Sequence, residues 1–78
     1  MYEAIFSDEF KKQLKKLKNK DSIMFERLQK KIKQILLEPT HLKYLKDILK
    51  GKQRVQLGQF VLKFEVKENK VYLITIKH

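Results

Sequence analysis

The sequence contains no cysteine and no tryptophan, and only one proline and two glycines among its 78 residues. The absence of cysteine excludes disulfide bonds and cysteine-ligated zinc, so the fold must rest on apolar packing. No apolar run approaches the roughly 18 residues that a membrane-spanning helix needs. The first seven residues also lack the basic start and long apolar stretch of a signal peptide. We therefore expect a soluble cytoplasmic protein that forms one domain over residues 1–78.

Charge of one sign dominates the composition. Lysine and arginine total 19 against 9 acidic residues, which leaves a net charge of +10. Such an excess attracts phosphates and speeds encounter with anionic partners, so we expect RNA or another polyanion as a partner. A lysine-rich, solvated surface of the kind found in heat-adapted proteins also fits the 36% charged content, and the two interpretations are compatible.

Residues 2–37 have the pattern of a short strand followed by two amphipathic helices. Tyr2 to Phe6 alternates as a strand does. Ser7, followed by two acids, predicts the start of the first helix, and Asp21 or Ser22 predicts the start of the second. Pro39 ends the second helix, because a residue before proline is disfavoured in the α region. The tight connection favours an antiparallel pair. The apolar stripes consist of Phe10, Leu14 and Leu17 in the first helix, and of Phe25, Leu28, Ile32, Ile35 and Leu36 in the second.

Residues 40–51 allow two interpretations. Their leucines and isoleucine are Leu42, Leu45, Ile48 and Leu49, which could line a short helix. The same side chains could instead anchor an irregular loop across the core. We favour the loop, with one helical turn in it.

After Gly51 the pattern changes to a period of two, which predicts strands. Gly58-Gln59 has glycine in the first central place, as a two-residue type II′ hairpin turn prefers. Residues 67–70 form a second polar turn before a last strand over 71–76. The resulting three-stranded meander can accept the opening strand at an edge, and the helices cover its apolar face. The fold class is therefore α+β, an N-terminal antiparallel helical hairpin packed on a small antiparallel sheet.

Most familiar catalytic arrangements are absent from the sequence. There is no cysteine nucleophile, no glycine-rich phosphate loop and no histidine pair at metal-binding spacing. His41 and His78 lie far apart, and such isolated histidines are more often surface residues than catalysts. We expect no metal, no cofactor, no small-molecule substrate and no membrane partner.

The remaining candidates for chemistry are cationic. Lys50 precedes the first hairpin strand, and Lys52 and Arg54 are two positions apart, so they share a face of a regular strand. Lys63 belongs to the polar face of the next strand. Convergent lysine and arginine side chains can hold a phosphate and stabilise charge in a transition state, and the planar arginine fork can bind two phosphate oxygens. A sheet with one solvent face also carries lysine and glutamate without any such role.

Several short strings of residues follow one another in order along nearly the whole chain. They are Phe10-Lys11-Lys12, Leu14-Lys15-Lys16-Leu17, Lys30-Lys31-Ile32, Ile35-Leu36 before Pro39, Leu49-Lys50-Gly51, Arg54-Val55, Gly58, Phe60, Phe64-Glu65-Val66 and Ile76-Lys77-His78. In this order and spacing the sequence resembles the RelE/ParE superfamily of toxins from bacterial and archaeal toxin–antitoxin modules.

The resemblance implies two N-terminal helices packed on a twisted antiparallel sheet. RelE-like members cut messenger RNA on the ribosome by promoting attack of a 2′-hydroxyl on the adjacent phosphate. ParE-like members inhibit DNA gyrase instead, and both kinds are silenced by an antitoxin that wraps around them. The implied partners are therefore a cognate antitoxin and RNA or the ribosome.

The family's functional positions carry over only in part. Arg54 matches the first of two basic positions in the first hairpin strand, whereas Gln56 occupies the second. Phe60 matches an aromatic of the next strand, and Val61 stands where an arginine is usual. The family usually continues past the final strand with an arginine and a tyrosine, and this sequence ends at His78. The candidate catalytic residues are Arg54, Lys52, Lys63 and His78, and the candidate phosphate-binding residues are Lys50, Lys11, Lys12 and Lys15.

Three hypotheses follow. The first is a RelE-type toxin that cleaves translated messenger RNA and is neutralised by an antitoxin. The second is a non-catalytic or ParE-like homologue that binds an antitoxin or blocks a macromolecular target. The third is a basic RNA-binding domain unrelated to toxins, with Tyr2, Tyr44 or Tyr72 available for base stacking.

Overall fold

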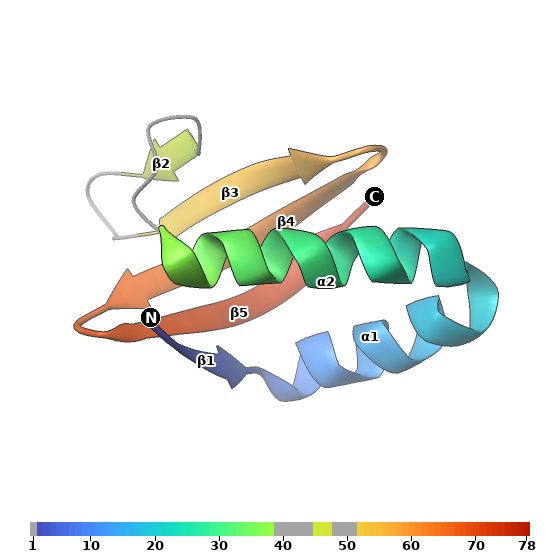
Figure 1. Cartoon of the computed structure of the whole chain (residues 1–78), viewed down its shortest axis with the longest axis horizontal. Helices are drawn as coiled ribbons and strands as arrows, with labels where there is room; N and C mark the ends of the chain where they lie inside the picture. The colour runs from blue at the N-terminus through green and yellow to red at the C-terminus, as the bar shows by residue number, and fades with distance from the viewer. Residues whose placement is uncertain (1, 39–44, 48–51) are drawn as a thin grey trace.

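The computed structural model describes residues 2–38, 45–47 and 52–78. In chain order these form β1 (Glu3–Phe6), α1 (Asp8–Lys20), α2 (Ser22–Leu37), β2 (Leu45–Asp47), β3 (Lys52–Leu57), β4 (Phe60–Lys67) and β5 (Lys70–Lys77), as Figure 1 shows. The two helices therefore precede the hairpin strands, as the sequence predicts.

Both helices begin at capping residues that the sequence proposes, Ser7 for α1 and, of the two candidates Asp21 and Ser22, Asp21 for α2. The Ser7 hydroxyl accepts a hydrogen bond from the Phe10 backbone N–H at 3.0 Å, and Asp21 Oδ1 accepts one from the Met24 N–H at 3.1 Å. Each side chain satisfies a helix N–H that has no partner within the helix. Helix α2 ends at Leu37, and Glu38, the residue before Pro39, has a non-helical backbone with φ −149° and ψ 69°.

The strands form one sheet in the order β1-β5-β4-β3-β2. Strands β2 to β5 pair antiparallel with their neighbours, whereas β1 pairs parallel to β5. No hairpin constrains β1 and β5, because the helices and the other strands lie between them in the chain. The α+β class and the helical hairpin are confirmed, and the sheet gains one parallel edge strand.

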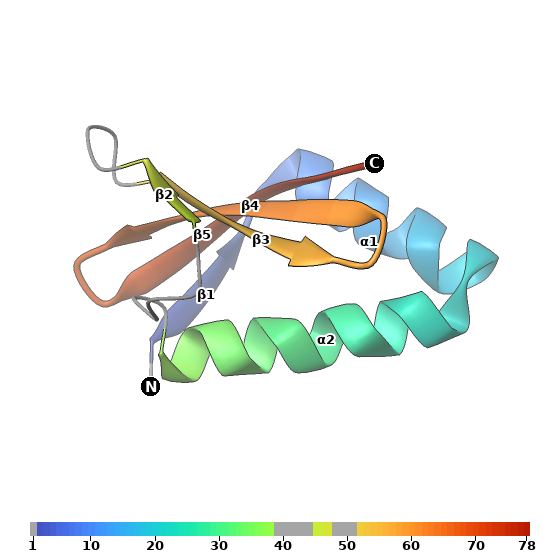
Figure 2. The same ribbon diagram turned by 90° about the horizontal axis from the view of Figure 1, so that it is seen from above.

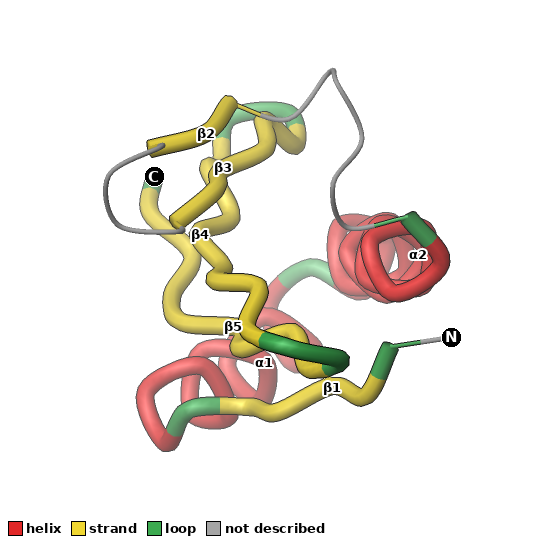
Figure 3. Tube along the Cα trace, turned by 90° about the vertical axis from the view of Figure 1, so that its left-hand side faces the viewer, coloured by secondary structure: helices red, strands yellow, loops and turns green. Residues whose placement is uncertain are grey.

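The helices occupy different places on this sheet. Helix α2 lies across one face, whereas α1 runs along β5 beyond the end of β1 (Figures 2 and 3). In the part of the chain that the structure describes, the opposite face carries no helix over β3 and β4, and α1 lies at its β5 edge (Figure 3). Neither described helix is long and apolar enough to cross a membrane.

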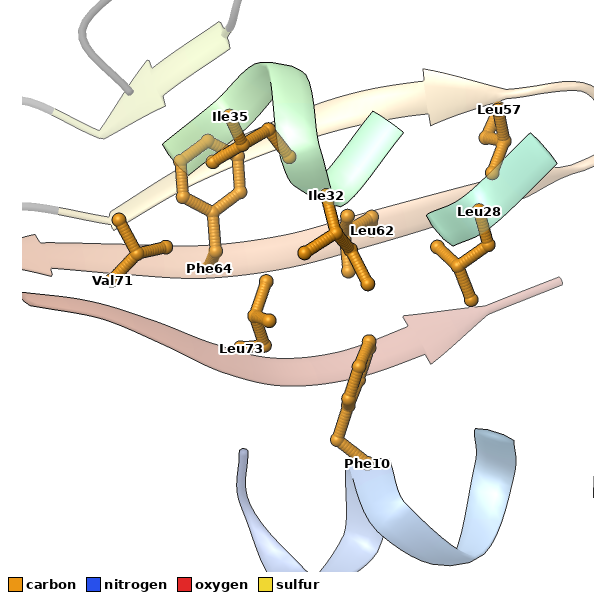
Figure 4. Packing of buried hydrophobic residues seen from close by; sticks show 9 residues of the cluster. All are labelled: Phe10, Leu28, Ile32, Ile35, Leu57, Leu62, Phe64, Val71 and Leu73. Carbon is orange, nitrogen blue, oxygen red and sulfur yellow. The ribbon is translucent and has the colours of Figure 1, made fainter. Parts of the chain in front are cut away.

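The core lies between α2, α1 and the covered face of the sheet. Phe10 points from α1 into the space between α2 and β5, and Phe64 packs below Ile35 (Figure 4). All three of these side chains have no exposed surface. The predicted stripes supply these contacts: Leu14, Leu17 and Leu36 pack partly buried around the same cluster. The buried members are Phe10, Leu28, Ile32, Ile35, Leu57, Leu62, Phe64, Val71 and Leu73.

One expectation is wrong within residues 40–51. Leu45–Asp47 forms strand β2 rather than a loop or a helical turn, and it pairs antiparallel with β3 from Leu45↔Arg54 to Asp47↔Lys52. Pairing of β2 with β3 supplies backbone partners that local sequence preference does not reveal. The remaining residues of this segment, including His41, Tyr44 and Lys50, lie outside the described residues.

Two tight turns connect β3, β4 and β5. Leu57 pairs with Phe60, so Gly58-Gln59 is a two-residue turn, and Gly58 has a φ of +61°. Lys67 pairs with Lys70 across a second two-residue turn, in which Glu68 has a φ of 58°. The second central residues, Gln59 and Asn69, do not have a positive φ. This is the pattern of a type II′ turn, in which only the first central residue has a positive φ. Both turns therefore agree with the prediction from the sequence.

Candidate functional site

The face of the sheet opposite α2 carries the cationic candidates in three cross-strand rows. We call it the outer face. Successive side chains of a strand point to opposite faces of the sheet, so the residues next to these in each strand point into the core. The rows, read from β3 through β4 to β5, are Lys52–Glu65–Tyr72, Arg54–Lys63–Thr75 and Gln56–Val61–Lys77. Lys52 and Arg54 are both exposed, which confirms that the strand is regular from its first residue.

The central row brings two positive charges together. Arg54 and Lys63 are direct cross-strand partners. Side chains in this relation have Cβ atoms about 5 Å apart, and like charges directly opposite each other are destabilising. An anion held between the two side chains removes that repulsion. This pair can therefore bind a phosphate, and the guanidinium can do so with two hydrogen bonds.

Lys52 has a different environment on the same face. Its cross-strand partner on β4 is Glu65, an opposite charge, and Glu65 in turn pairs with Tyr72. Opposite-charge pairs of this kind stabilise a sheet modestly. Lys52 is therefore opposite a negative charge, whereas the described cross-strand partners of Arg54, which are Leu45 and Lys63, carry none.

A β-bulge determines which residues of β5 belong to these rows. The register shifts between Lys63↔Thr75 and Phe64↔Leu73, so Ile74 has no direct partner on β4. Strict alternation would place Ile76 opposite Val61, but the bulge places Lys77 there. The outer face thereby gains a third cation at its β5 end.

Helix α1 is joined to this end of β5 by one side chain. Gln13 donates from Nε2 to the Ile76 carbonyl at 2.9 Å, and its Oε1 accepts from the Ile76 N–H at 2.9 Å. The same amide also contacts Thr75 Oγ1 at 3.1 Å. Gln13 thus replaces a neighbouring strand beyond the end of β1, and Thr75 is left only 5% exposed.

His78 lies apart from the central row. Its Nε2 is 2.8 Å from Gln59 Oε1, and its ring meets the Phe60 ring edge-on with centroids 5.4 Å apart. Phe60 alternates with Val61 and so belongs to the row of Leu57, whose side chain is buried in the core. Of the four candidate catalytic residues, the structure therefore brings Arg54, Lys52 and Lys63 onto one face and places His78 at the β3–β4 turn.

The candidate phosphate-binding lysines of α1 are exposed. Lys11, Lys12 and Lys15 all project from the helix into solvent, and Lys50 lies outside the described residues. No group of three or more His, Cys, Asp or Glu side chains capable of holding a metal occurs among residues 2–38, 45–47 and 52–78.

Sequence reasoning overlooked the contribution of Gln13, Thr75 and Lys77 to this region, whereas it had named Tyr72 as a candidate for base stacking. Gln13 carried one usable signal, because it is a polar residue between Phe10 and Leu17 on the buried side of a lysine-rich helix. Lys77 carried none, since its face depends on the bulge. Tyr72 is the aromatic that lies on the outer face, whereas Tyr2 packs against the core.

Comparison with known proteins bears on the fold. No protein-family model matches the sequence, and no curated protein matches it. Among solved structures, a chain of the intact E. coli RelBE toxin–antitoxin complex superposes with a TM-score of 0.83 at 21% sequence identity. The match covers 97% of this chain and 94% of that chain. The chain therefore has a RelE-like fold over almost its whole length, as the resemblance in sequence implies.

Proposed function

We propose that this chain is the toxin of a toxin–antitoxin module and that it cleaves translated messenger RNA on its outer face. The observation that carries the proposal is the direct opposition of Arg54 and Lys63 on the sheet face opposite α2 in a RelE-like fold. The net charge of +10 supports a polyanionic target.

The arrangement supports cleavage by an internal attack. The 2′-oxygen of one nucleotide bonds to the adjacent phosphorus as the bond from phosphorus to the 5′-oxygen breaks, which leaves a cyclic phosphate and a 5′-hydroxyl. The 2′-hydroxyl loses its proton, and the departing 5′-oxygen gains one. Arg54 and Lys63 hold the non-bridging oxygens and stabilise the extra negative charge of the transition state. Tyr72 is the cross-strand partner of Glu65 on β5, and its ring offers a stacking surface for a base.

An antitoxin is the proposed protein partner. The superposed chain comes from a toxin–antitoxin complex, and this chain matches it over 97% of its length. The strongly basic surface suits an acidic partner, which would be encoded beside this chain.

The proposal is tested by inducible expression in a bacterial host, with primer extension on a translated messenger RNA. We expect growth arrest and new 5′ ends within the translated region. Arg54→Ala should relieve the arrest and reduce cleavage at least ~100-fold, because one charge-stabilising donor is worth roughly 3 kcal/mol in an active site.

The matched control is Arg27→Ala. It removes the same side chain and the same charge from an exposed position on α2, on the other side of the sheet. Arrest and cleavage should persist in this variant. Equal relief by both substitutions would show that only total charge matters, and unchanged toxicity of Arg54→Ala would remove Arg54 from the site.

The neighbouring row, which contains Gln56 and Val61, favours an alternative function without RNA cleavage. Gln56 and Val61 are neutral partners where RelE-like sequences usually carry basic residues, so the cationic set is smaller than the resemblance implies. A non-catalytic or ParE-like homologue would arrest growth without cutting RNA, or would bind an antitoxin without arresting growth. The same primer-extension experiment separates these outcomes from cleavage.

A further inference from the structure

Helix α1 carries six lysines, and its contact with β5 divides them between two sides of the molecule. Gln13 fixes the orientation of the helix, because its amide binds Thr75 and Ile76 at the free edge of β5. Leu14 packs against the core that α2 covers. One flank of Gln13 therefore turns toward the core, and the other continues onto the outer face.

Helical geometry gives the positions of four of these lysines around the helix axis. At 3.6 residues per turn, Leu14 lies about 100° from Gln13 around the axis on the core side. Lys12 and Lys16 lie about 100° and about 60° from Gln13 on the opposite side, toward the outer face. Lys11 and Lys15 both lie about 160° from Gln13, on the side of α1 that faces away from β5.

The outer-face lysines of α1 continue an existing row of cations. Gln13 contacts Thr75, whose cross-strand partner is Lys63, and Lys63 is opposite Arg54. Lys77 follows Thr75 on the same strand and lies opposite Val61. Strand register and the Gln13 contact thus place cations on β3, β4 and β5 and continue them onto α1, which lies beside β5.

We propose that single-stranded RNA bound at Arg54 and Lys63 leaves the sheet over the contact between Gln13 and Thr75 and that Lys12 and Lys16 bind its phosphates. Lys11 and Lys15 lie off this path. The inference rests on the proposed function, and it defines where the RNA continues beyond the cleavage site. Phosphate contacts of this kind position a strand without reading its bases.

The chain offers a matched comparison for the test. Lys12 and Lys16 are four residues apart and exposed on α1, and so are Lys11 and Lys15. The double variants Lys12→Gln with Lys16→Gln and Lys11→Gln with Lys15→Gln therefore remove equal charge with equal helix propensity. Thermal unfolding of both variants verifies that each is folded.

Binding is measured by fluorescence anisotropy with a labelled 2′-O-methyl uridine oligonucleotide of about 12 nucleotides, a length typical of single-strand sites. The 2′-O-methyl group blocks cleavage, so the readout is binding alone. Loss of Lys12 and Lys16 should weaken binding about ten-fold at 0.1 M salt and reduce the slope of log K against log salt by about 1.4, at 0.7 per phosphate. Loss of Lys11 and Lys15 should weaken binding less than about two-fold.

The outcomes separate this inference from the proposed function. Equal weakening by the two double variants would overturn the path, while cleavage that depends on Arg54 would leave the proposed function standing. A wild-type protein that does not bind the oligonucleotide would overturn the path whatever the growth assay shows. The same binding measurement is made with a polyglutamate peptide of the same length. If the two double variants differ as much in their affinity for this peptide as for the oligonucleotide, the assignment of the path to RNA is overturned.

Discussion

Two positive-φ residues occupy equivalent places in the two turns of the meander. Gly58 and Glu68 each hold the first central position of a two-residue turn, with φ of +61° and 58°. Glycine adopts this conformation without penalty, whereas an L side chain is strained there by roughly 1–2 kcal/mol. A Cβ at position 58 would also lie 3.1 Å from Met24 Cε, which is tighter than most Cβ contacts. The first turn is therefore relaxed, and the second stores strain.

Opposite substitutions in these turns should have opposite effects on the free energy of unfolding. Gly58→Ala should lower it by roughly 1–3 kcal/mol, because it adds strain and crowds Met24. Glu68→Gly should raise it by about 0.5–1 kcal/mol, since relief of strain exceeds the added freedom of the unfolded chain. Urea denaturation measures both changes. Stabilisation by Gly58→Ala, or destabilisation by Glu68→Gly, would contradict this account of the turns.

At the scale of elements, strand β5 depends on a succession of different partners along one edge. Strand β1 pairs with it from Lys70 to Leu73. Beyond this, the Ser7 hydroxyl donates to the Ile74 carbonyl at 2.7 Å, and Gln13 takes over at Thr75 and Ile76. Unpaired edges invite association with other chains, and these side chains close the edge where no strand continues.

Loss of the Gln13 side chain should therefore destabilise the whole domain. Gln13→Ala leaves the Ile76 N–H and carbonyl without these partners, and we expect a loss of about 1–3 kcal/mol. The control is Gln29→Ala at an exposed position of α2, where a change within about 0.5 kcal/mol is expected. Urea denaturation of the two variants gives the comparison. Equal effects would mean that Gln13 contributes nothing through its contacts with β5.

At the scale of the molecule, charge opposes compactness. The chain carries +10 over an ellipsoid-like extent of 34 × 21 × 20 Å. Its α1 helix also holds lysines four residues apart, such as Lys11 with Lys15 and Lys12 with Lys16, which repel each other. The same charge that favours binding of a polyanion therefore weakens the free fold.

Salt should stabilise the free protein. Raising sodium chloride from about 20 to about 300 mM shortens the screening length several-fold and should raise the melting temperature by a few degrees. A neutral solute at equal osmolality serves as the control, because it does not screen charge. A melting temperature that falls with added salt would show that attractive ion pairs, rather than net repulsion, dominate the surface.

The sequence determined most of the local structure. Ser7 and Asp21 identify the helix starts, the apolar stripes identify the core faces, and Gly58 identifies a hairpin turn. These features depend on residues within a few positions of each other, so local geometry is enough to predict them. Resemblance in the order of short strings also led to the RelE-like fold that the superposition shows.

The tertiary structure decided how distant segments meet. The parallel pairing of β1 with β5, the formation of β2 and the contact of Gln13 with Thr75 join residues that local patterns do not connect. The candidate site shows the same division. Sequence alone selects Arg54 and Lys63, but only strand register places them opposite each other. A single extra residue in β5 moves Lys77 onto their face, because side chains alternate with a period of two and one insertion reverses every later position.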